Sequence, residues 1–423
     1  MSKSYKLILA KAVKRAARLR GGGSALPGLF IERIYPNFLA DTLSQLPRGV
    51  VVISGTNGKT TTTKMVVELL ESQGLTVFTN RSGSNFTRGV ASSLLETITI
   101  QGELHADIAV LELDEAHAVH FVRTVKPTYS LLLNVLRDQL DRFGEIDTTA
   151  RLLEQIAEST TDTIVVNRED PRLAAFSSKL IDKNIVYFGL DDSLLAMFPS
   201  DDDMRGDNNV LHAQPLSATA TLTDVEGHDA VFRLHDKPYH ATLKLDGVYN
   251  VFNATAALAL TAEIVGSSVD YTKLIAALEA IRPAFGRGET LLVNEQPLEL
   301  VLVKNPSGFR LGLSSFDPTG YATMIAINDN YADGRDMSWL WDVDFDSLKT
   351  EGVASVSGVR AYDMALRLQY DEVEITHVDT DLKKSLRLFI QQNSSKPKRI
   401  FCTYTAMLAL RKQLSKITNV ERI

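Results

Sequence analysis

The hydrophobic residues of this 423-residue chain fall into short apolar runs that alternate with stretches of helical spacing. Between about residues 50 and 287 this alternation repeats, and each apolar run has the length of a strand. The predicted strands are Val50–Ile53, Thr76–Phe78, Ile108–Leu113, Tyr129–Leu133, Thr163–Val166 and Ile185–Phe188. Strands that alternate with helices form a parallel sheet flanked by helices, so the pattern predicts an α/β fold.

Residues 198–243 interrupt this pattern. Segments rich in Asp, Asn and Gly resemble loops, and residues 218–222 and 230–234 alternate polar and apolar positions as antiparallel strands do. We therefore expect an inserted β-meander at 198–243. The helix Val251–Ile264 then returns the chain to the sheet.

A linker near Gly286–Glu289 is expected to lead into a second, smaller Rossmann-like α/β domain. Its predicted strands are Leu298–Val303, Met324–Ile327, Gly352–Val356, Glu374–His377 and Arg399–Thr403. The expected organisation is a lead-in over residues 1–48, a central domain over 49–290 and a C-terminal domain over 291–423.

Charge is distributed unevenly along the chain. Residues 1–20 hold seven Lys or Arg and no acid, whereas the whole chain carries a net charge of −7. Apolar residues alternate with the basic ones, which predicts a basic helix that ends at the glycines 21–23. Two interpretations stay open: the helix lies on an anionic membrane surface, or it is solvated and packs on its own domain. The acidic remainder argues against general nucleic-acid binding.

The composition is that of a soluble globular protein. No apolar run approaches the ~20 residues that cross a bilayer. The single cysteine, Cys402, excludes an intramolecular disulfide and a cysteine-rich zinc site, and it fits a reducing cytosol. We expect Cys402 to be a small buried hydrophobe.

The richest motif lies between the strand Val50–Ile53 and the following helical stretch. It consists of Gly55, Thr56, Asn57, Gly58, Lys59, Thr60 and Thr61. Glycines let backbone N–H groups point at phosphate oxygens, and the helix N-terminus adds partial positive charge. Lys59 is expected to reach the β- and γ-phosphates of ATP, and the Thr60 hydroxyl to bind Mg²⁺.

Further polar residues come at the ends of the later strands. Glu112 and Asp114 end one strand and suit magnesium binding, although acids there are often helix caps. The other clusters are Asn80–Gly89, the charged segment Asn134–Glu145 with Asp138 and Asp141, Asn167 with Asp170, Asn250 with Asn253, and Arg287. Ligands of parallel α/β sheets bind at these strand ends, but each cluster alone also suits an ordinary loop, cap or ion-pair network.

In the C-terminal region, the segment Asn328–Asp342 follows a predicted strand. It places Asp329, Asp333, Asp336 and Asp342 around two tryptophans. An acidic loop with this aromatic content favours a functional surface over a plain linker.

Taken in order, these motifs resemble the Mur ligase superfamily, which includes folylpolyglutamate synthase. The matching residues are the 55–61 loop, Glu112, Asn167 with Asp170-Pro171, Asn250 with Asn253 and Ala256-Ala257, and Gly286-Arg287. The resemblance is closer to the MurT branch, the ligase-like subunits of lipid II isoglutaminyl synthase. The segments that carry it are Leu111–Glu115, Arg137–Asp147, Lys304–Pro306 and Asn328–Trp339.

This resemblance implies ATP-dependent amidation of the D-glutamate α-carboxylate in the lipid II stem peptide through an acyl phosphate. Lys59 and Glu112 would act in catalysis, Thr60 and Glu112 would bind Mg²⁺, and the loop with Asn167, Asp170, Asn250, Asn253 and Arg287 would bind ATP. Ammonia would come from a GatD-like glutaminase in a heterodimer. Asp336, or as second choice Asp342, would complete that partner's catalytic triad. The implied location is the cytoplasm, possibly at the inner face of the membrane.

The chain also departs from ordinary Mur ligases. Gln139, Tyr249 and Lys304 stand where those enzymes have histidine, and 198–243 holds none of the cysteines with which some MurT members bind zinc. We therefore expect no structural zinc. Two alternatives to the amidation remain: an amino-acid-adding ligase of the folylpolyglutamate type, and a binding subunit whose nucleotide site regulates assembly.

Overall fold

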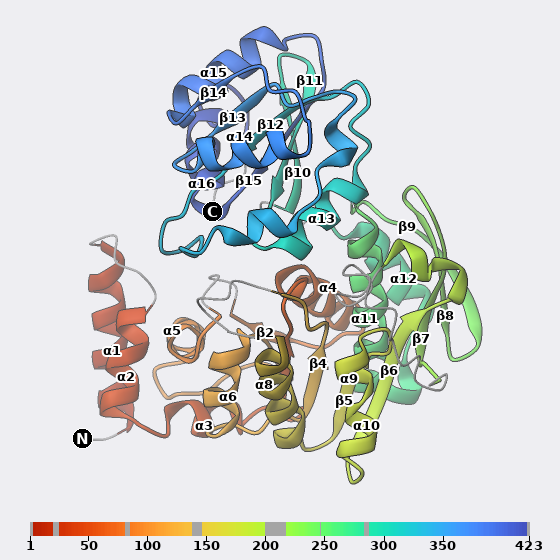
Figure 1. The fold of residues 1–423 in the computed structure, drawn as a ribbon. Coiled ribbons are helices and arrows are strands. Elements are labelled where there is room, and N and C mark those ends of the chain that lie inside the picture. Colours follow the sequence, from red (N-terminus) through yellow and green to blue (C-terminus); the bar gives the residue numbers. More distant parts are fainter. Residues whose placement is uncertain are drawn as a thin grey trace. The chain divides into compact units, whose positions relative to one another are not determined.

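The computed structural model describes residues 3–19, 25–80, 85–137, 146–198, 217–245, 247–282 and 287–420 (Figure 1). The chain divides into two compact units, which we describe one at a time. Unit 1 comprises Met1–Val135, Asp147–Lys244 and Tyr249–Ile281, and unit 2 comprises Leu136–Ile146, Leu245–Val248 and Arg282–Ile423.

Unit 1 is built on a nine-stranded sheet in the order β2-β3-β1-β4-β5-β6-β7-β8-β9. The strands are β1 Val50–Ser54, β2 Val77–Thr79, β3 Ile108–Glu112, β4 Tyr129–Leu132, β5 Thr163–Asn167, β6 Asn184–Leu190, β7 Ala220–Glu226, β8 Asp229–Leu234 and β9 Lys237–Thr242. All pairs from β2 to β7 are parallel, and β7–β8 and β8–β9 are antiparallel. The predicted parallel α/β sheet is confirmed.

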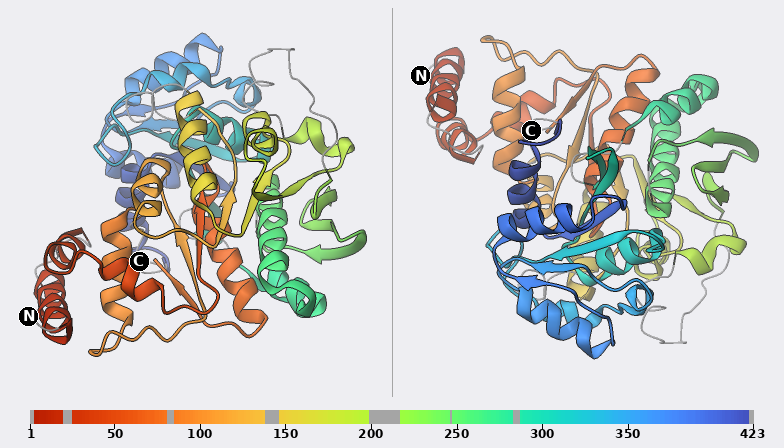
Figure 2. Two further views of the ribbon diagram at one scale, coloured as in Figure 1. Left: turned by 90° about the horizontal axis from the view of Figure 1, so that it is seen from below. Right: turned by 90° about the horizontal axis from the view of Figure 1, so that it is seen from above.

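Helices cover both faces of this sheet (Figure 2). The helices of unit 1 are α1 Lys3–Leu19, α2 Ala25–Ile34, α3 Phe38–Leu43, α4 Lys59–Ser72, α5 Thr87–Thr97, α6 Glu115–Val122, α8 Ile146–Ser159, α9 Pro171–Ala174, α10 Phe176–Lys179, α11 Val248–Val265 and α12 Tyr271–Ala280, with short 3₁₀ turns η1 Asp192–Met197 and η3 Gly266–Ser268, and α1 and α2 pack on α5 rather than on the sheet. Because helices shield the sheet on each side, every residue of β1 is buried.

The order of the strands positions the site. β1 lies between β3 and β4, and the register pairs Ile53 with Glu112 on one side and with Leu131 on the other. The carboxyl ends of these three parallel strands therefore meet at one edge of the sheet, where ligands of such folds bind. The loop between β1 and α4 starts at this edge.

The expected meander is present as β7, β8 and β9. It does not form a separate sheet, because β7 pairs in parallel with β6 and extends the main sheet. Residues 199–216, which belong to the same predicted insertion, lie outside the described part of the chain.

One described helical stretch, Val248–Ser268, is long and apolar enough to cross a bilayer by length and composition alone. However, 67% of its apolar window is buried inside the protein. We therefore assign α11 to the core of unit 1.

Unit 2 contains a six-stranded sheet in the order β10-β11-β15-β12-β13-β14. The strands are β10 Arg287–Val293, β11 Gln296–Leu302, β12 Ala322–Ala326, β13 Ser355–Ser357, β14 Val378–Asp379 and β15 Lys398–Cys402, and the helices are α13 Pro306–Ser315, α14 Ala361–Tyr370, α15 Leu382–Gln392 and α16 Tyr404–Leu414, with 3₁₀ turns η4 Ser338–Asp342 and η5 Asp346–Leu348. Only β10–β11 is antiparallel.

Alternation along the central strands divides the core of unit 2 between the two faces of its sheet. On β15, Phe401 packs with Phe309 and Trp339 on one face, whereas Ile400 and Cys402 face the other cluster. The period of two residues is the geometry of a strand buried on both sides. Cys402 is fully buried, as expected from the sequence.

Three details of the C-terminal prediction are wrong. The segment 286–289, expected to be a linker, contains the start of β10, which begins at Arg287 and pairs with β11. The strand predicted at 352–356 is observed at Ser355–Ser357, and the strand predicted at 374–377 is observed at Val378–Asp379. Within the latter segment only Ile375 forms a bridge, with Val353.

Candidate active site

The turn after β1 is held in an unusual shape by glycines and by an asparagine from a neighbouring strand end. Gly55 and Gly58 have φ angles of 134° and 88°, which side chains other than glycine rarely adopt. Asn134, which follows β4, accepts a hydrogen bond from the N–H of Asn57 at 2.9 Å and donates one to its carbonyl at 3.1 Å. Its own carbonyl accepts from the N–H of Thr56 at 3.0 Å. The protein's own hydrogen bonds therefore hold the shape of the turn.

Asn253 of α11 lies directly against this turn. A Cβ atom built on Gly58 would stand 2.6 Å from Oδ1 of Asn253 and 3.0 Å from its Nδ2. The structure thus brings the predicted residue Asn253 to the loop. Asn250 is one helical turn earlier on α11, on the same side of the helix.

Lys59 is the first residue of α4, and its side chain is buried. Its Nζ donates to the carbonyl of Gly55, to that of Thr56 at 3.3 Å, and to Oε2 of Glu115 at 3.4 Å. Both charged side chains of the Lys59–Glu115 pair are buried, so each charge depends on the other. No role for Glu115 follows from the sequence alone, because its contact with Lys59 depends on where α6 begins.

Thr60 and Glu112 lie side by side. The Thr60 hydroxyl donates to Oε1 of Glu112 at 2.8 Å. Asn80, at the end of β2, accepts from the N–H of Glu112 at 3.0 Å and donates to its carbonyl at 2.9 Å. A hydroxyl and a carboxylate at this distance are the hard oxygen ligands that Mg²⁺ prefers. The donor set therefore fits magnesium.

Asn167 and Asp170 shape the neighbouring strand end. Asn167 donates to the carbonyl of Leu133 at 3.0 Å. Asp170 is buried and accepts from the N–H groups of Val135 at 2.6 Å and, as the N-cap of α9, of Arg172 and Leu173. Burial raises the pKa of Asp170 to about 6, against the opposing effect of these hydrogen bonds.

Asp114 also follows β3 at this edge, whereas several other predicted residues lie outside the described part of the chain. Asp114 is the N-cap residue of α6, and within the described residues its carboxylate accepts no hydrogen bond. Arg287 belongs to unit 2, and its side chain lies outside the described part, as do Gly286, residues 81–84 of the polar loop, and Asp138, Gln139, Asp141 and Arg142 of the charged segment.

In unit 2 the structure separates the four aspartates of the predicted acidic loop by their contacts. Asp329 pairs with Arg360 at 2.8 Å, and buried Asp333 accepts from the N–H and the hydroxyl of Thr405. Asp336 is only partly exposed and accepts from the N–H of Ser338 at 2.9 Å through one oxygen. Among the described residues its other oxygen accepts no hydrogen bond. Asp342 is exposed, and its carboxylate accepts none there either.

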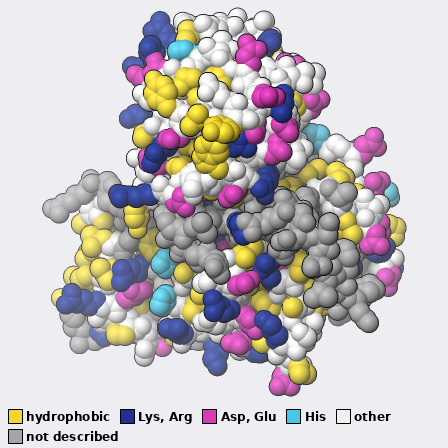
Figure 3. All heavy atoms as spheres, in the orientation of Figure 1, with side chains coloured by type: hydrophobic (Ala, Val, Ile, Leu, Met, Phe, Trp, Pro, Cys, Tyr) yellow, Lys and Arg dark blue, Asp and Glu magenta, His cyan; other side chains and the backbone are white. Residues whose placement is uncertain are grey.

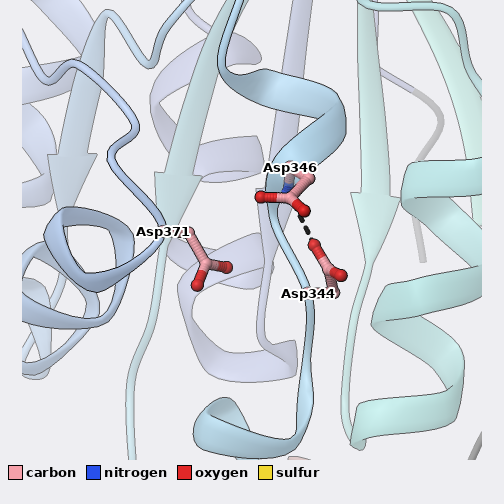
Figure 4. Close-up of side chains that lie close together, drawn as sticks. All are labelled: Asp344, Asp346 and Asp371. Atoms are coloured by element: carbon pink, nitrogen blue, oxygen red, sulfur yellow. Dashed lines mark hydrogen bonds between the residues drawn. The ribbon is translucent and has the colours of Figure 1, made fainter.

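A second group of carboxylates in unit 2 has metal-like spacing but internal partners. Oxygens of Asp344, Asp346 and Asp371 lie within 4.8 Å of one another (Figure 4). Asp371 accepts from Arg367 at 2.5 Å and from the N–H of Phe345, and Lys349 pairs with Asp346 at 2.5 Å. Asp344 accepts from the N–H of Asp346 at 2.8 Å, so each carboxylate has a partner within the protein, and we interpret the group as a network that fixes the loop.

Cys402 does not suit nucleophilic chemistry. Burial, with a smaller contribution from Asp333, raises the pKa of its thiol far above the usual value. A thiol that stays protonated is a poor nucleophile.

Comparisons with known proteins find relatives of both units of the chain. A family model for the Mur ligase middle domain matches residues 53–261, and one for the MurT ligase C-terminal region matches residues 302–407. The MurT subunit of the glutamine-hydrolysing lipid II isoglutaminyl synthase of Streptococcus pneumoniae is 31% identical, over 93% of each chain. The Staphylococcus aureus subunit of the same name is 27% identical, over 89% of this chain and 90% of that one.

A solved structure shows the same fold. The MurF ligase of Thermotoga maritima in complex with ADP superposes with a TM-score of 0.67, over 89% of this chain and 81% of that chain, at 17% identity. The α/β fold expected from the sequence is therefore confirmed.

Substitution of Gly58 tests how tightly Asn253 packs on the loop. Gly58 and Gly74 both have φ of 88°, so alanine costs about 1–2 kcal/mol of backbone strain at either position. Only at Gly58 must a new Cβ displace a neighbour, because nothing lies within 4 Å of the Cβ position at Gly74. Titration with a fluorescent ATP analogue should show binding weakened at least about tenfold by Gly58→Ala and unchanged by Gly74→Ala. Equal affinities for the two variants would contradict the packing argument.

The buried carboxyl of Asp170 should make stability depend on pH. Its folded-state pKa of about 6 exceeds the ordinary 3.8, so protonation favours the folded state. This stabilisation is complete below about pH 4 and is lost as the pH rises through about 6, a change of about 2–3 kcal/mol. The free energy of unfolding of the wild type and of Asp170→Asn can be measured with urea between pH 4 and 7. As the pH rises, the value for the wild type should fall relative to that for the variant. A constant difference would refute the raised pKa.

Proposed function

This chain belongs to the MurT family of Mur ligases, and from this premise we propose that it amidates the D-glutamate α-carboxylate of the lipid II stem peptide. The relatives that cover nearly its whole length are named as subunits of glutamine-hydrolysing lipid II isoglutaminyl synthase. The observation that carries the proposal is the preformed loop at the end of β1, where Lys59, Thr60 and Glu112 converge.

The reaction requires activation of a carboxylate, because ammonia cannot displace oxide from it. A carboxylate oxygen attacks the γ-phosphorus of ATP, and the bond between that phosphorus and the bridging oxygen breaks with release of ADP. Ammonia then attacks the carbonyl carbon of the acyl phosphate, the C–O bond to phosphate breaks, and the nitrogen loses a proton to solvent. The products are the amide, ADP and inorganic phosphate.

The side chains at the loop suit the first step. Lys59 would exchange its carbonyl and Glu115 contacts for phosphate oxygens and stabilise the charge on the transferring phosphoryl group. Thr60 and Glu112 would hold Mg²⁺, which when bound neutralises phosphate charge. Binding of ATP in this family is supported by the ADP complex of the structurally similar MurF ligase.

The remaining contacts to ATP are assigned to residues of unit 1 near the same edge of the sheet and, from the family motif alone, to Arg287. Asn253 touches Gly58, and Asn167 and Asp170 form the adjacent strand end. Because the carboxylate oxygens of Asp170 accept hydrogen bonds from backbone N–H groups, its role would be to shape the binding site. Asn250 and Arg287 complete the proposed set through the family motifs.

The nitrogen donor would be a GatD-like glutaminase that binds this chain as a heterodimer. Asp336 would orient the partner's catalytic histidine, since one of its oxygens accepts no hydrogen bond from the described residues. Its bond to Ser338 would fix the carboxylate in place. Because the substrate is a lipid-linked precursor, we place the reaction in the cytoplasm at the inner face of the membrane.

Two substitutions should separate the synthetase step from the glutaminase step. Lys59→Ala removes the phosphoryl-stabilising cation, so amidation should fall at least about 100-fold with either ammonia or glutamine. Asp336→Asn should lower only the glutamine-dependent rate, by about 10³–10⁴-fold, because free ammonia bypasses the partner. Mass spectrometry of the muropeptide and release of phosphate measure both reactions with the reconstituted complex.

Asp342→Asn is the matched control for the triad assignment, and the thermal midpoint of each variant checks folding. A selective loss in Asp342→Asn instead of Asp336→Asn would transfer the role to Asp342. An equal loss with both nitrogen sources in Asp336→Asn would end the triad proposal. Transfer of an amino acid without a glutaminase would favour the amino-acid-adding ligase, and absence of any amide would favour a regulatory nucleotide site.

A further inference from the structure

The helix pair α1–α2 presents a face that neither the nucleotide site nor the acidic loop uses. One side of α1 is fixed to unit 1: Leu7 and Ala10 are fully buried, Nζ of Lys11 donates to the carbonyl of Ile98 at 2.6 Å, and Lys14 pairs with Glu96 at 3.2 Å. Because Ile98 is the C-cap of α5, these lysines also compensate the negative end of that helix. The rotation of α1 about its axis is thereby set.

Each helix of the pair also exposes two large apolar side chains. Tyr5 and Ile8 of α1 are 54% and 51% exposed, and Leu26 and Leu29 of α2 are 59% and 42% exposed. Tyr5 and Ile8 are three residues apart and lie on one side of α1. Large apolar side chains that gather on a surface mark a contact with another body. We call these four residues the α1–α2 apolar face.

Basic residues border this face, although Lys11 and Lys14 contact unit 1 instead. Residues 1–31 contain seven Lys or Arg and no Asp or Glu, and Glu32 is the first acid. Arg15 of α1 and Arg33 of α2 are exposed. Figure 3 shows Lys and Arg side chains next to apolar ones over this pair of helices. The combination of an apolar face and a cationic border is that of helices that lie in a membrane interface.

We propose that the α1–α2 apolar face docks on an anionic lipid bilayer. The apolar side chains enter the boundary between headgroups and acyl chains, and the border cations bind lipid phosphates. Each basic residue near such a surface contributes about 1 kcal/mol, and the apolar face adds to this. A second copy of the chain is the poorer occupant, because a two-fold contact would bring the two cationic borders together.

This inference does not depend on the proposed amidation, because it concerns residues outside the nucleotide site. It gives a physical basis for work at a membrane: a lipid-linked substrate diffuses in two dimensions, and docking confines the enzyme to the same surface. The sequence left two interpretations of this helix open. The inner side of α1 packs on its own domain, as the first expected, and its outer side remains available to lie on a membrane, as the second expected.

Sedimentation of the full-length protein with vesicles tests the proposal. Binding to phosphatidylcholine vesicles that contain phosphatidylglycerol should exceed binding to pure phosphatidylcholine and should weaken as NaCl increases. Ile8→Glu and Leu29→Glu should each weaken binding about tenfold, because a carboxylate replaces a buried apolar group next to anionic lipid. Arg15→Gln and Arg33→Gln should each weaken it about fivefold.

Ile181→Glu is the matched control, because Ile181 lies on the segment between α10 and β6 and is 83% exposed. This substitution changes the net charge by the same amount as Ile8→Glu. It should bind vesicles as the wild type does. Equal binding to neutral and anionic vesicles, or equal effects of Ile8→Glu and Ile181→Glu, would overturn the proposal. If Ile8→Glu lowers the thermal midpoint of unfolding, the vesicle binding of Arg15→Gln decides the test instead. Loss of a dimer in sedimentation velocity, without a change in vesicle binding, would assign the face to a second copy.

Discussion

The nucleotide site depends on the shape of one turn, which asparagine amides hold from two sides. Asn134 bonds to the backbone on one side of the turn, and Asn253 packs against Gly58 on the other. Both amides come from elements distant in sequence, so the turn acquires its shape only when the sheet and α11 are assembled. A loop fixed in this way loses little conformational entropy on binding, which leaves more of the interaction energy for the ligand.

In the proposed function, the two units have mainly different tasks. Unit 1 gathers its functional groups at the ends of parallel strands, where buried backbone and short side chains hold them firmly. Unit 2 instead places its acidic loop beside an aromatic core in which Trp339 packs on Phe309, so that a well-packed sheet supports the loop. This division fits a synthetase that activates a carboxylate in one unit and cooperates with a separate nitrogen donor through the other.

The sequence predicted the sheet of unit 1 well because its strands are continuous apolar runs buried on both faces, as Val50–Ile53 illustrates. It failed at β10, where Gly286 and Gly288 indicated a linker. The β10–β11 turn uses Asn294 and Glu295 with φ of 52° and 64°, a pairing without the usual Asn-Gly signal. The position of Glu112 could be predicted because it ends an apolar strand. The Lys59–Glu115 contact could not, because it depends on three-dimensional packing that no local sequence pattern encodes.

The resting contacts of Lys59 also act as an internal competitor. To bind the Lys59 ammonium group, a phosphate chain would have to replace its contacts with the carbonyl oxygens of Gly55 and Thr56 and with the buried carboxylate of Glu115. A nucleotide whose chain is too short to reach this nitrogen leaves those contacts intact and gains nothing from them. If Lys59 binds phosphate as proposed, the affinity for nucleotides would therefore depend on the length of the phosphate chain.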